Sequence, residues 1–222
     1  MPREGDDVAT RVSISFEEAA FGCKKEVNFA RIENCPDCSG SGAKSQSDIA
    51  KCPACNGLGR INVRQQTMLG YMQTQRTCQR CSGRGKIIKN PCNTCRGKGK
   101  VRRTQKIKVK IPAGVDAGQS VRLRNEGCAG YNGGPNGDLL VEIYLKRHPI
   151  FERQNMDVFC EVPITFTQAA LGGEIEVPTL DGKTTYEIPE GTQTGRQFVL
   201  SGKGIPQVGN PKRRGNQYIT VV

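Results

Sequence analysis

The sequence lacks any long apolar run. A membrane-spanning helix needs about 18 consecutive apolar residues, and no such stretch occurs among the 222 residues. The first residues, MPREGDDVAT, also lack the apolar segment of a secretory signal peptide. We therefore expect a soluble, cytoplasmic protein with no membrane partner.

Aromatic residues are scarce as well, with no tryptophan, 5 tyrosines and 7 phenylalanines. The chain is basic, with a formal net charge of +12, and a basic surface is one mark of a nucleic-acid-binding protein. Proteins that hold single strands commonly stack the bases on aromatic side chains among basic residues, and no such cluster is present. We therefore expect no nucleic acid partner. Binding to DNA or RNA that weakens steeply with salt would revive that alternative.

Cysteine, in contrast, is abundant and regularly spaced. An odd total of 11 cysteines in a chain expected in the reducing cytosol argues against a disulfide framework. Most of them lie in four octets of the form C-x-x-C-x-G-x-G, which begin at residues 35, 52, 78 and 92. Two cysteines two residues apart can bind one tetrahedral ion, so four such pairs predict two zinc sites. The others, Cys23, Cys128 and Cys160, are interpreted as small packing residues.

The segment between the second and third octets predicts how the four pairs combine. It reads RINVRQQTMLGYMQTQRT and predicts a β-hairpin with arms at 61–67 and 72–77 around a turn at Leu69-Gly70. A hairpin returns its two ends to one place, so the second octet should join the third, and the first should join the fourth. The expected zinc sites are Cys35, Cys38, Cys92 and Cys95, and Cys52, Cys55, Cys78 and Cys81.

Both expected sites are filled by sulfur, which leaves no open position for water or substrate. We therefore interpret them as structural and expect no enzymatic activity. The glycines at the sixth and eighth places of each octet should adopt φ > 0 and bring backbone N–H groups to the sulfur atoms. The enzymatic alternative is a CxxC thiol–disulfide oxidoreductase, but that chemistry favours one reactive pair at the start of a helix. Titration of free thiols in the metal-loaded protein would separate the two.

A second repeat spans the rest of the chain. IPAGVDAGQSVRLRNEG, which begins at Ile111, matches IPEGTQTGRQFVLSGKG 77 residues later. VSISFEEAAFGCKKEV, which begins at Val12, matches VPITFTQAALGGEIEV 150 residues later. The two offsets differ by 73 residues, and the extra residues in the first copy contain all four octets. The zinc module is therefore an insertion into the first of two similar domains.

Each copy predicts a mostly β domain with one short helix. The alternation of apolar and basic residues in KIKVKI, residues 106–111, is typical of a strand with one buried face. Ser15 with Glu18 gives the first helix a capping-box pattern. Thr165 with Gln168 repeats that pattern in the second copy. The expected fold is mostly β, with two tandem similar β-sandwich-like domains and a cysteine-rich two-zinc module inserted in the first.

The repeat also sets the expected domain limits. The first β domain is discontinuous, and the second is expected to be truncated at its C-terminal end. The limits are 1–32 with 102–149 for the first β domain, 33–101 for the zinc module and 150–222 for the second β domain.

The octets, their insertion point, and the segments GGPNGDLLVEI and RHPIFERQNMDVFCEVPITFTQAALGG resemble the zinc-containing DnaJ family of heat-shock co-chaperones. The resemblance covers essentially the whole chain. It implies a co-chaperone that binds unfolded client polypeptides, delivers them to the ATP-driven chaperone DnaK and stimulates the ATPase of that partner. It also implies a homodimer for the full-length protein.

The sequence departs from the family pattern in two respects. The J domain of the family acts through His-Pro-Asp, whereas the single histidine, His148, is followed by Pro149 and Ile150. The chain also stops at Val222, before the dimerisation segment of the family. We therefore expect a monomeric client-binding fragment that does not raise the turnover of DnaK.

A protein that binds unfolded chains can take the client as an extra strand at an exposed sheet edge, beside apolar pockets. The resemblance implies a client pocket in the first β domain, and the alternative is that the same residues form an ordinary core. The hairpin tip from Met68 to Met72 is a further candidate for contact with client or with DnaK. The implied pocket residues are Val8, Val27, Phe29, Ile107 and Val141.

Overall fold

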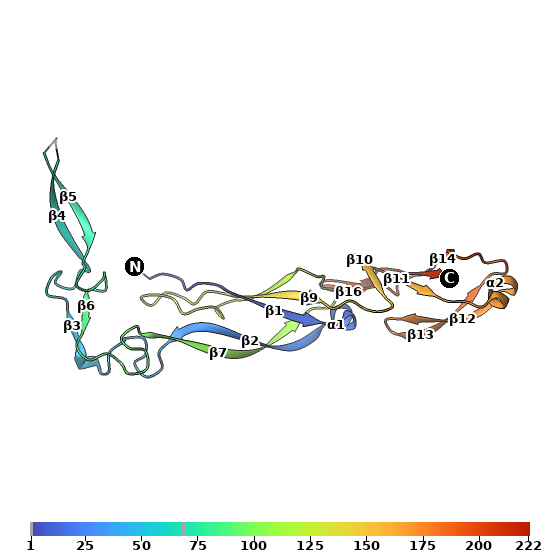
Figure 1. Ribbon diagram of the computed structural model, residues 1–222, viewed down its shortest axis with the longest axis horizontal. Coiled ribbons are helices and arrows are strands. Elements are labelled where there is room, and N and C mark those ends of the chain that lie inside the picture. Colours follow the sequence, from blue (N-terminus) through green and yellow to red (C-terminus); the bar gives the residue numbers. More distant parts are fainter. Residues whose placement is uncertain (1, 68–69) are drawn as a thin grey trace. The chain divides into compact units, whose positions relative to one another are not determined.

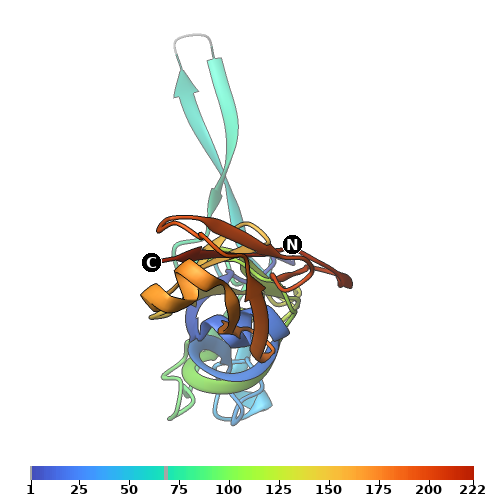
Figure 2. The same cartoon turned by 90° about the vertical axis from the view of Figure 1, so that its right-hand side faces the viewer.

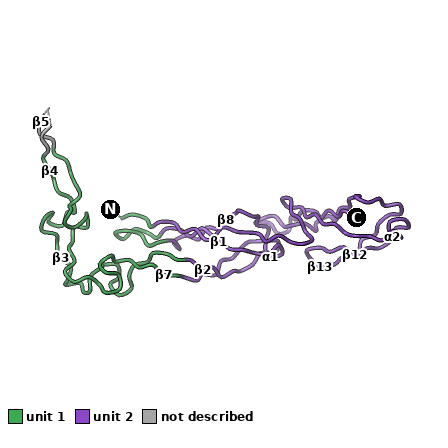
Figure 3. Tube along the Cα trace, viewed as in Figure 1, with its two compact units in different colours: residues 1–5, 30–104, 128–136 green, residues 6–29, 105–127, 137–222 purple. Residues whose placement is uncertain are grey.

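The computed structural model describes residues 2–67 and 70–222. They form two compact units, which Figure 3 distinguishes by colour. Unit 1 contains residues 1–5, 30–104 and 128–136, and unit 2 contains residues 6–29, 105–127 and 137–222. Because these units do not separate the two β domains, the domain limits expected from the sequence remain a proposal. The predicted fold class, mostly β with a cysteine-rich module, is confirmed.

Unit 1 contains the four octets and short antiparallel strand pairs between them (Figure 1). β3 pairs with β6, and β4 pairs with β5. The hairpin of β4 and β5, cyan in Figure 2, is paired from Arg60↔Thr77 to Thr67↔Gly70, which confirms the predicted hairpin. Of the predicted turn, Leu69 lies outside the described residues, and Gly70 belongs to β5, where it pairs with Thr67. The predicted tip contacts from Met68 to Met72 involve residues and side chains outside the described part. The elements are η1 Gln46–Asp48, β3 Ile49–Lys51, β4 Arg60–Thr67, β5 Gly70–Thr77 and β6 Lys86–Ile88.

The first β domain, whose strands β2 and β7 run from unit 2 into unit 1, consists of two small sheets. One has the strand order β1-β9-β8, with β1 parallel to β9, and the other pairs β2 with β7. Lysines 106, 108 and 110 are exposed while Val109 and Ile111 are buried, so the predicted alternation is confirmed. The elements are β1 Val8–Ile14, α1 Phe16–Phe21, β2 Cys23–Asn34, β7 Lys100–Ile111, β8 Ser120–Leu123 and β9 Leu139–Leu145.

The second β domain repeats this plan with one additional strand in its main sheet. The strand order is β10-β11-β17-β14, with β11 parallel to β17, and β12 forms a hairpin with β13. Its first elements are β10 Glu152–Gln154, β11 Asp157–Val162, α2 Phe166–Leu171 and β12 Gly173–Thr179. The others are β13 Gly182–Ile188, β14 Gln197–Leu200, β15 Pro206–Gln207, β16 Asn210–Arg214 and β17 Gln217–Val221.

The two α-helices begin with the capping boxes predicted from the sequence. The hydroxyl of Ser15 accepts the Glu18 N–H at 3.2 Å, and the Glu18 carboxylate accepts the Ser15 N–H at 2.9 Å. Thr165 and Gln168 make the same reciprocal pair at 3.3 and 3.0 Å. Both helices have six residues, and within the described residues none is long and apolar enough to cross a membrane.

Helix α1 contributes to two hydrophobic cores. Ala19 is buried in the core of the first β domain, whereas Phe16 and Ala20 are buried in the core of the second. The ring of Phe16 lies 6.0 Å from that of Phe151, which precedes β10. The helical pattern predicted the helix but gave no sign that two domains share it.

Candidate functional site

Each cysteine octet forms the same turn. In every octet, the N–H of the eighth residue, a glycine, donates to the sulfur of the second cysteine. The sixth and eighth residues all have φ between 71° and 90°, so the predicted role of these glycines is confirmed. The four bonds are Gly42 to Cys38 at 3.2 Å, Gly59 to Cys55 at 3.2 Å, Gly85 to Cys81 at 3.3 Å and Gly99 to Cys95 at 3.2 Å.

The fifth place of each octet also has φ > 0, which the sequence analysis missed. The residues there are Ser39, Asn56, Ser82 and Arg96, with φ between 47° and 51°. Asparagine tolerates this region through its short polar side chain. The arginine at the last of the four positions gives no such signal, so only the repetition of the octet could have indicated a common backbone.

Glycine is required at the eighth place because octets approach each other closely in pairs. A Cβ at Gly99 would lie 2.3 Å from the carbonyl oxygen of Gly40, and a Cβ at Gly85 would lie 2.3 Å from that of Gly57. Backbone bonds join the same partners reciprocally. They are Cys35 N–H to Gly99 at 2.9 Å, Cys92 N–H to Gly42 at 2.8 Å, Cys52 N–H to Gly85 at 2.9 Å and Cys78 N–H to Gly59 at 2.9 Å.

This pairing brings together two groups of four cysteines, the first octet with the fourth and the second with the third. Within each group all ligand atoms lie within 4.8 Å of one another. Sulfur atoms of partner octets are 3.9 and 3.7 Å apart in both groups. A tetrahedron with Zn–S bonds of about 2.3 Å has edges of roughly 3.8 Å, so the donor set fits zinc. The groups are Cys35, Cys38, Cys92 and Cys95, and Cys52, Cys55, Cys78 and Cys81.

The pKa values of the thiols differ within each group. Burial raises the pKa of Cys35 to about 11. Burial also acts to raise the pKa of Cys38, but hydrogen bonds from the Gly42 N–H and neighbouring thiols outweigh it and lower the pKa to about 7. The second group repeats the contrast, with Cys81 at about 11 and Cys55 at about 7. Because zinc binds thiolates, its affinity should fall as the pH falls.

The five residues implied as a client pocket lie in one hydrophobic cluster of the first β domain. Val27, Phe29 and Val141 are buried within it, at 4%, 5% and 0% exposure, and Val8 and Ile107 pack against it half-buried. The structure therefore brings the five together.

Strand β1 is an edge of its sheet in the described residues, since the order is β1-β9-β8. The equivalent strand of the second β domain, β11, is covered by β10, with Arg153 opposite Val158. Val158 is 0% exposed, whereas Val8, its counterpart 150 residues earlier, is only half-buried. The first β domain thus has an open strand edge where the second carries a strand of its own.

Three cysteines and the single histidine lie outside the zinc groups. Cys160 is buried in the second core, Cys23 packs against the first, and the sulfur of Cys128 accepts the Ile32 N–H at 3.4 Å. His148 accepts backbone N–H groups of the two residues that begin the second β domain, at 3.1 and 3.0 Å. The other ring nitrogen of His148, Nε2, lies 3.0 Å from the Glu17 carboxylate of α1. The contacts of these side chains are thus packing, turn formation and one polar pair.

Comparison with known proteins places these features in a family context. Residues 8–222 match the family described as DnaJ C terminal domain. The chain is 56% identical over 221 residues to "Chaperone protein DnaJ" of Ruminiclostridium cellulolyticum, covering 99% of this chain and 58% of that protein. The protein of the same name from Acetivibrio thermocellus is 56% identical over 220 residues, covering 99% and 57%. That of Halalkalibacterium halodurans is 49% identical over 220 residues, covering 99% and 59%. The chain thus spans less than three fifths of these relatives.

Proposed function

The chain belongs to the DnaJ C-terminal-domain family, and on that premise we propose that it binds unfolded or non-native polypeptide and hands it to a DnaK-type ATP-driven chaperone. The observation that carries the proposal is the open edge of β1 beside the apolar cluster of the first β domain. An extended client can pair with such an edge through its main chain, and pockets for alternate side chains accept many sequences.

The sister domain indicates how a client would sit. β10 runs antiparallel to β11 and covers it from Asp157 to Phe159. The equivalent stretch of the first β domain is residues 7–9. A client strand in that place would cover Val8 as β10 covers Val158, and it would extend the apolar cluster to which Val8 already contributes.

The backbone of β1 supplies the hydrogen-bonding groups that this pairing needs. The N–H of Val8 donates to the Asp138 carbonyl at 2.9 Å, toward the neighbouring strand β9. Successive residues of a strand point their backbone groups to opposite sides. The N–H groups of Ala9, Arg11 and Ser13 therefore face the open edge.

A pair of variants at Ala9 tests the proposal. Proline removes the N–H at the open edge, and edge positions tolerate proline in the fold, whereas Ala9→Thr keeps the N–H. Affinity for a fluorescent, permanently unfolded polypeptide should fall about tenfold in Ala9→Pro, equivalent to about 1.4 kcal/mol, and stay near wild type in Ala9→Thr. Equal affinity of both variants and the wild type would refute client binding at this edge.

The two cysteine groups belong to the same proposal as structural zinc centres. The chain carries two zinc ions, and we assign their ligands to the two groups of four cysteines. When bound, zinc cross-links the octets. The cysteine pairs lie on glycine turns, and their sulfurs have the spacing of zinc ligands, which favours a structural role over thiol–disulfide exchange.

Delivery to DnaK, a cytoplasmic location and a homodimeric full-length protein complete the proposal. The chain by itself lacks the His-Pro-Asp sequence through which the family stimulates ATPase activity, since Pro149 and Ile150 follow His148. The expected result of a steady-state ATPase measurement is therefore unchanged DnaK turnover on addition of this chain alone. A clear rise in turnover would contradict that part of the proposal.

A further inference from the structure

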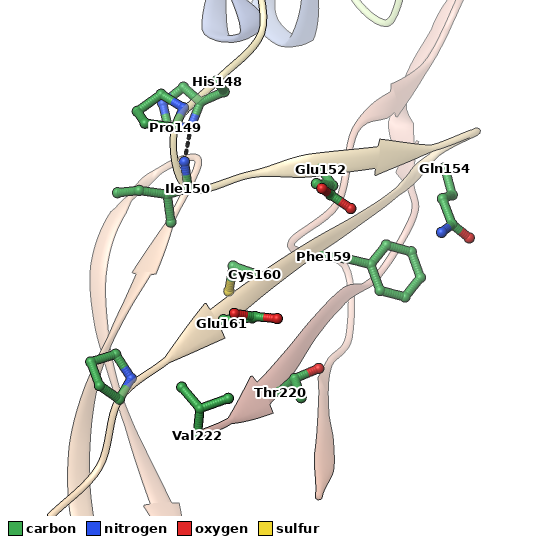
Figure 4. Close-up of a pocket in the computed structure, with 11 residues that line it drawn as sticks. His148, Pro149, Ile150, Glu152, Gln154, Phe159, Cys160, Glu161, Thr220 and Val222 are labelled. Atoms are coloured by element: carbon green, nitrogen blue, oxygen red, sulfur yellow. Dashed lines mark hydrogen bonds between the residues drawn. The ribbon is translucent and has the colours of Figure 1, made fainter. Parts of the chain in front are cut away.

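A cavity of about 660 Å³ lies on the outer face of the main sheet of the second β domain. The strands β10, β11 and β17 form its floor, and Figure 4 shows the side chains of Glu152, Phe159 and Glu161 over the first two. This face is opposite to the core, because Val158, Cys160 and Val162 point inward and are buried. The principal lining residues are Glu152, Gln154, Phe159, Glu161, Thr220 and Val222.

An apolar row crosses this face. Phe159 stacks on Tyr218, with ring centroids 4.9 Å apart and an interplanar angle of 10°. Tyr218 pairs across the sheet with Val199, which is 45% exposed. Side chains of this kind on the outer face of a sheet can bind an apolar partner. The first β domain has no such row at the equivalent positions, where Ala9, Leu140 and Arg122 stand.

The charges at one end of the row also differ between the copies. In the first β domain, Arg11 and Glu142 face each other across β1 and β9 and form an ion pair at 2.8 Å. Their counterparts in the second are Glu161 and Thr220, which face each other across β11 and β17. A glutamate thus replaces the arginine of the first copy, and no basic side chain stands opposite it.

A second glutamate reinforces the negative charge. Glu152 on β10 lies opposite Phe159, two residues from Glu161, so the two glutamates are diagonal neighbours about 7–8 Å apart. In the part of the chain that the structure describes, neither carboxylate has a hydrogen-bond or ion-pair partner. The neighbouring Arg153 does not neutralise them, because its guanidinium donates to the Gly114 carbonyl at 2.9 Å.

From this arrangement we propose that the outer face of the second β domain is a second polypeptide site, selective for an extended segment with Lys or Arg beside a large apolar side chain. The cation of the bound segment lies between Glu152 and Glu161 and neutralises the two carboxylates, which have no basic partner of their own in the described residues. The apolar side chain packs on Phe159 and Tyr218. This inference rests on the proposed function and adds a charge preference to it.

The test compares two labelled peptides in a Gly-Ser background, one with a Lys-Phe-Leu centre and one with Gln-Phe-Leu. Their affinities for the full chain are measured by fluorescence anisotropy at low and at physiological salt. The wild type should bind the lysine peptide about fivefold more tightly at low salt, with a smaller ratio at higher salt. Glu152→Gln with Glu161→Gln should abolish this preference. Phe159→Ser should weaken binding of both peptides.

A matched control removes the same charge from another sheet of the same domain. Glu174 and Glu187 are exposed and face each other on β12 and β13, and their double change to glutamine should leave the lysine preference intact. Equal affinity of the wild type for both peptides, or a preference that survives Glu152→Gln with Glu161→Gln, would overturn the inference. Self-association of the wild type that this double variant abolishes would instead assign the face to a second copy of the chain.

The outcome is independent of the site on β1. Ala9→Pro should lower the affinity for unfolded polypeptide and leave the preference for the lysine peptide unchanged, because Ala9 is not part of this face. If the wild type bound no unfolded polypeptide at all, the proposed function itself would fail. If it bound polypeptide normally without a lysine preference, only the second site would fail.

Discussion

Helices α1 and α2 occupy equivalent places in the two β domains, yet only α1 is buried. Both start with a capping box and a phenylalanine. Phe16 is 6% exposed and packs near Phe151, whereas Phe166 is 89% exposed. The repeated sequence thus sets the local structure, because capping depends on residues within one turn. The burial of the two phenylalanines differs because it depends on which other segment of the chain packs against each helix.

The strand edges repeat this contrast. β11 is covered by β10, which the same chain supplies, whereas β1 is an edge in the described residues. Unpaired edges invite an additional strand, and proteins usually cover or disrupt them. The copy with the open edge is also the one that carries the zinc insertion. The two copies have therefore acquired different surfaces on a common framework.

The largest difference between the copies should follow metal removal, since only the first contains the insertion. Structural zinc contributes about 10–16 kcal/mol per site to folding. A chelator, or Cys52→Ser, should abolish amide-exchange protection in β3 and β4 and leave it unchanged in β11 and β17. Cys23→Ser, which lies outside the zinc groups, is the control. Loss of protection in both regions would show that the second β domain depends on the insertion.

The next effect concerns the two phenylalanines. Phe16→Ala should lower the free energy of unfolding by about 3–5 kcal/mol, because it leaves a cavity at the second core. Phe166→Ala should change it by about 0.5 kcal/mol or less, as expected of an exposed residue. Urea unfolding of the two variants measures both. A similar loss of unfolding free energy in both variants would mean that the face of α2 that carries Phe166 is covered in solution.

A smaller effect is expected from acid at Asp138 of the first β domain. The hydrogen bond from the Asn125 N–H, with the nearby Arg122, holds the pKa of Asp138 below its ordinary value of 3.8. The stabilisation is therefore present above that value and is lost as the pH falls through the lowered pKa. The counterpart of Asp138 is Asn216, which accepts the Gly202 N–H at 3.2 Å without a charge.

Two substitutions sharpen this prediction. Asp138→Asn should reduce the dependence of unfolding free energy on pH below about pH 4, and Asn216→Asp should add a further contribution of this kind in the second β domain. Urea midpoints measured across this range provide the comparison. An unchanged pH profile in Asp138→Asn would contradict the assigned role of the carboxylate.

The smallest difference is expected at the helix caps. Ser15→Ala and Thr165→Ala should each lower the free energy of unfolding by about 1 kcal/mol, because each leaves one N–H without its capping oxygen. Thermal unfolding of the two variants is a sufficient measurement. A cost at Ser15 several times that at Thr165 would show that the cap of α1 is coupled to the packing of Phe16.

Sequence repetition predicted the cysteine site well, because its determinants are local. The octet spacing, the positive φ of Gly42 and its counterparts, and the joining of the first octet to the fourth all follow from turns and one hairpin. The positive φ at Arg96 was missed, since arginine has no preference for that region.

The tertiary features were harder to predict. β10 has only three residues, too few for an alternation of apolar and polar residues to reveal a strand. Its pairing with β11 nevertheless closes the strand edge that stays open in the first β domain. Nothing in the helical pattern of residues 16–21 indicates that Phe16 packs in one domain and Ala19 in another. Likewise, the unpaired charge of Glu161 becomes visible only when Thr220 is placed opposite it.

The most direct test of the account is amide hydrogen exchange of β1, resolved by residue, with and without unfolded polypeptide. The account predicts slower exchange on binding at Ala9 and Arg11, whose N–H groups face the open edge, and no change in β12 of the second β domain, which β13 already pairs and which belongs to neither proposed site. Unchanged exchange at Ala9 and Arg11, with polypeptide bound at saturation, would contradict the placement of the client on this strand.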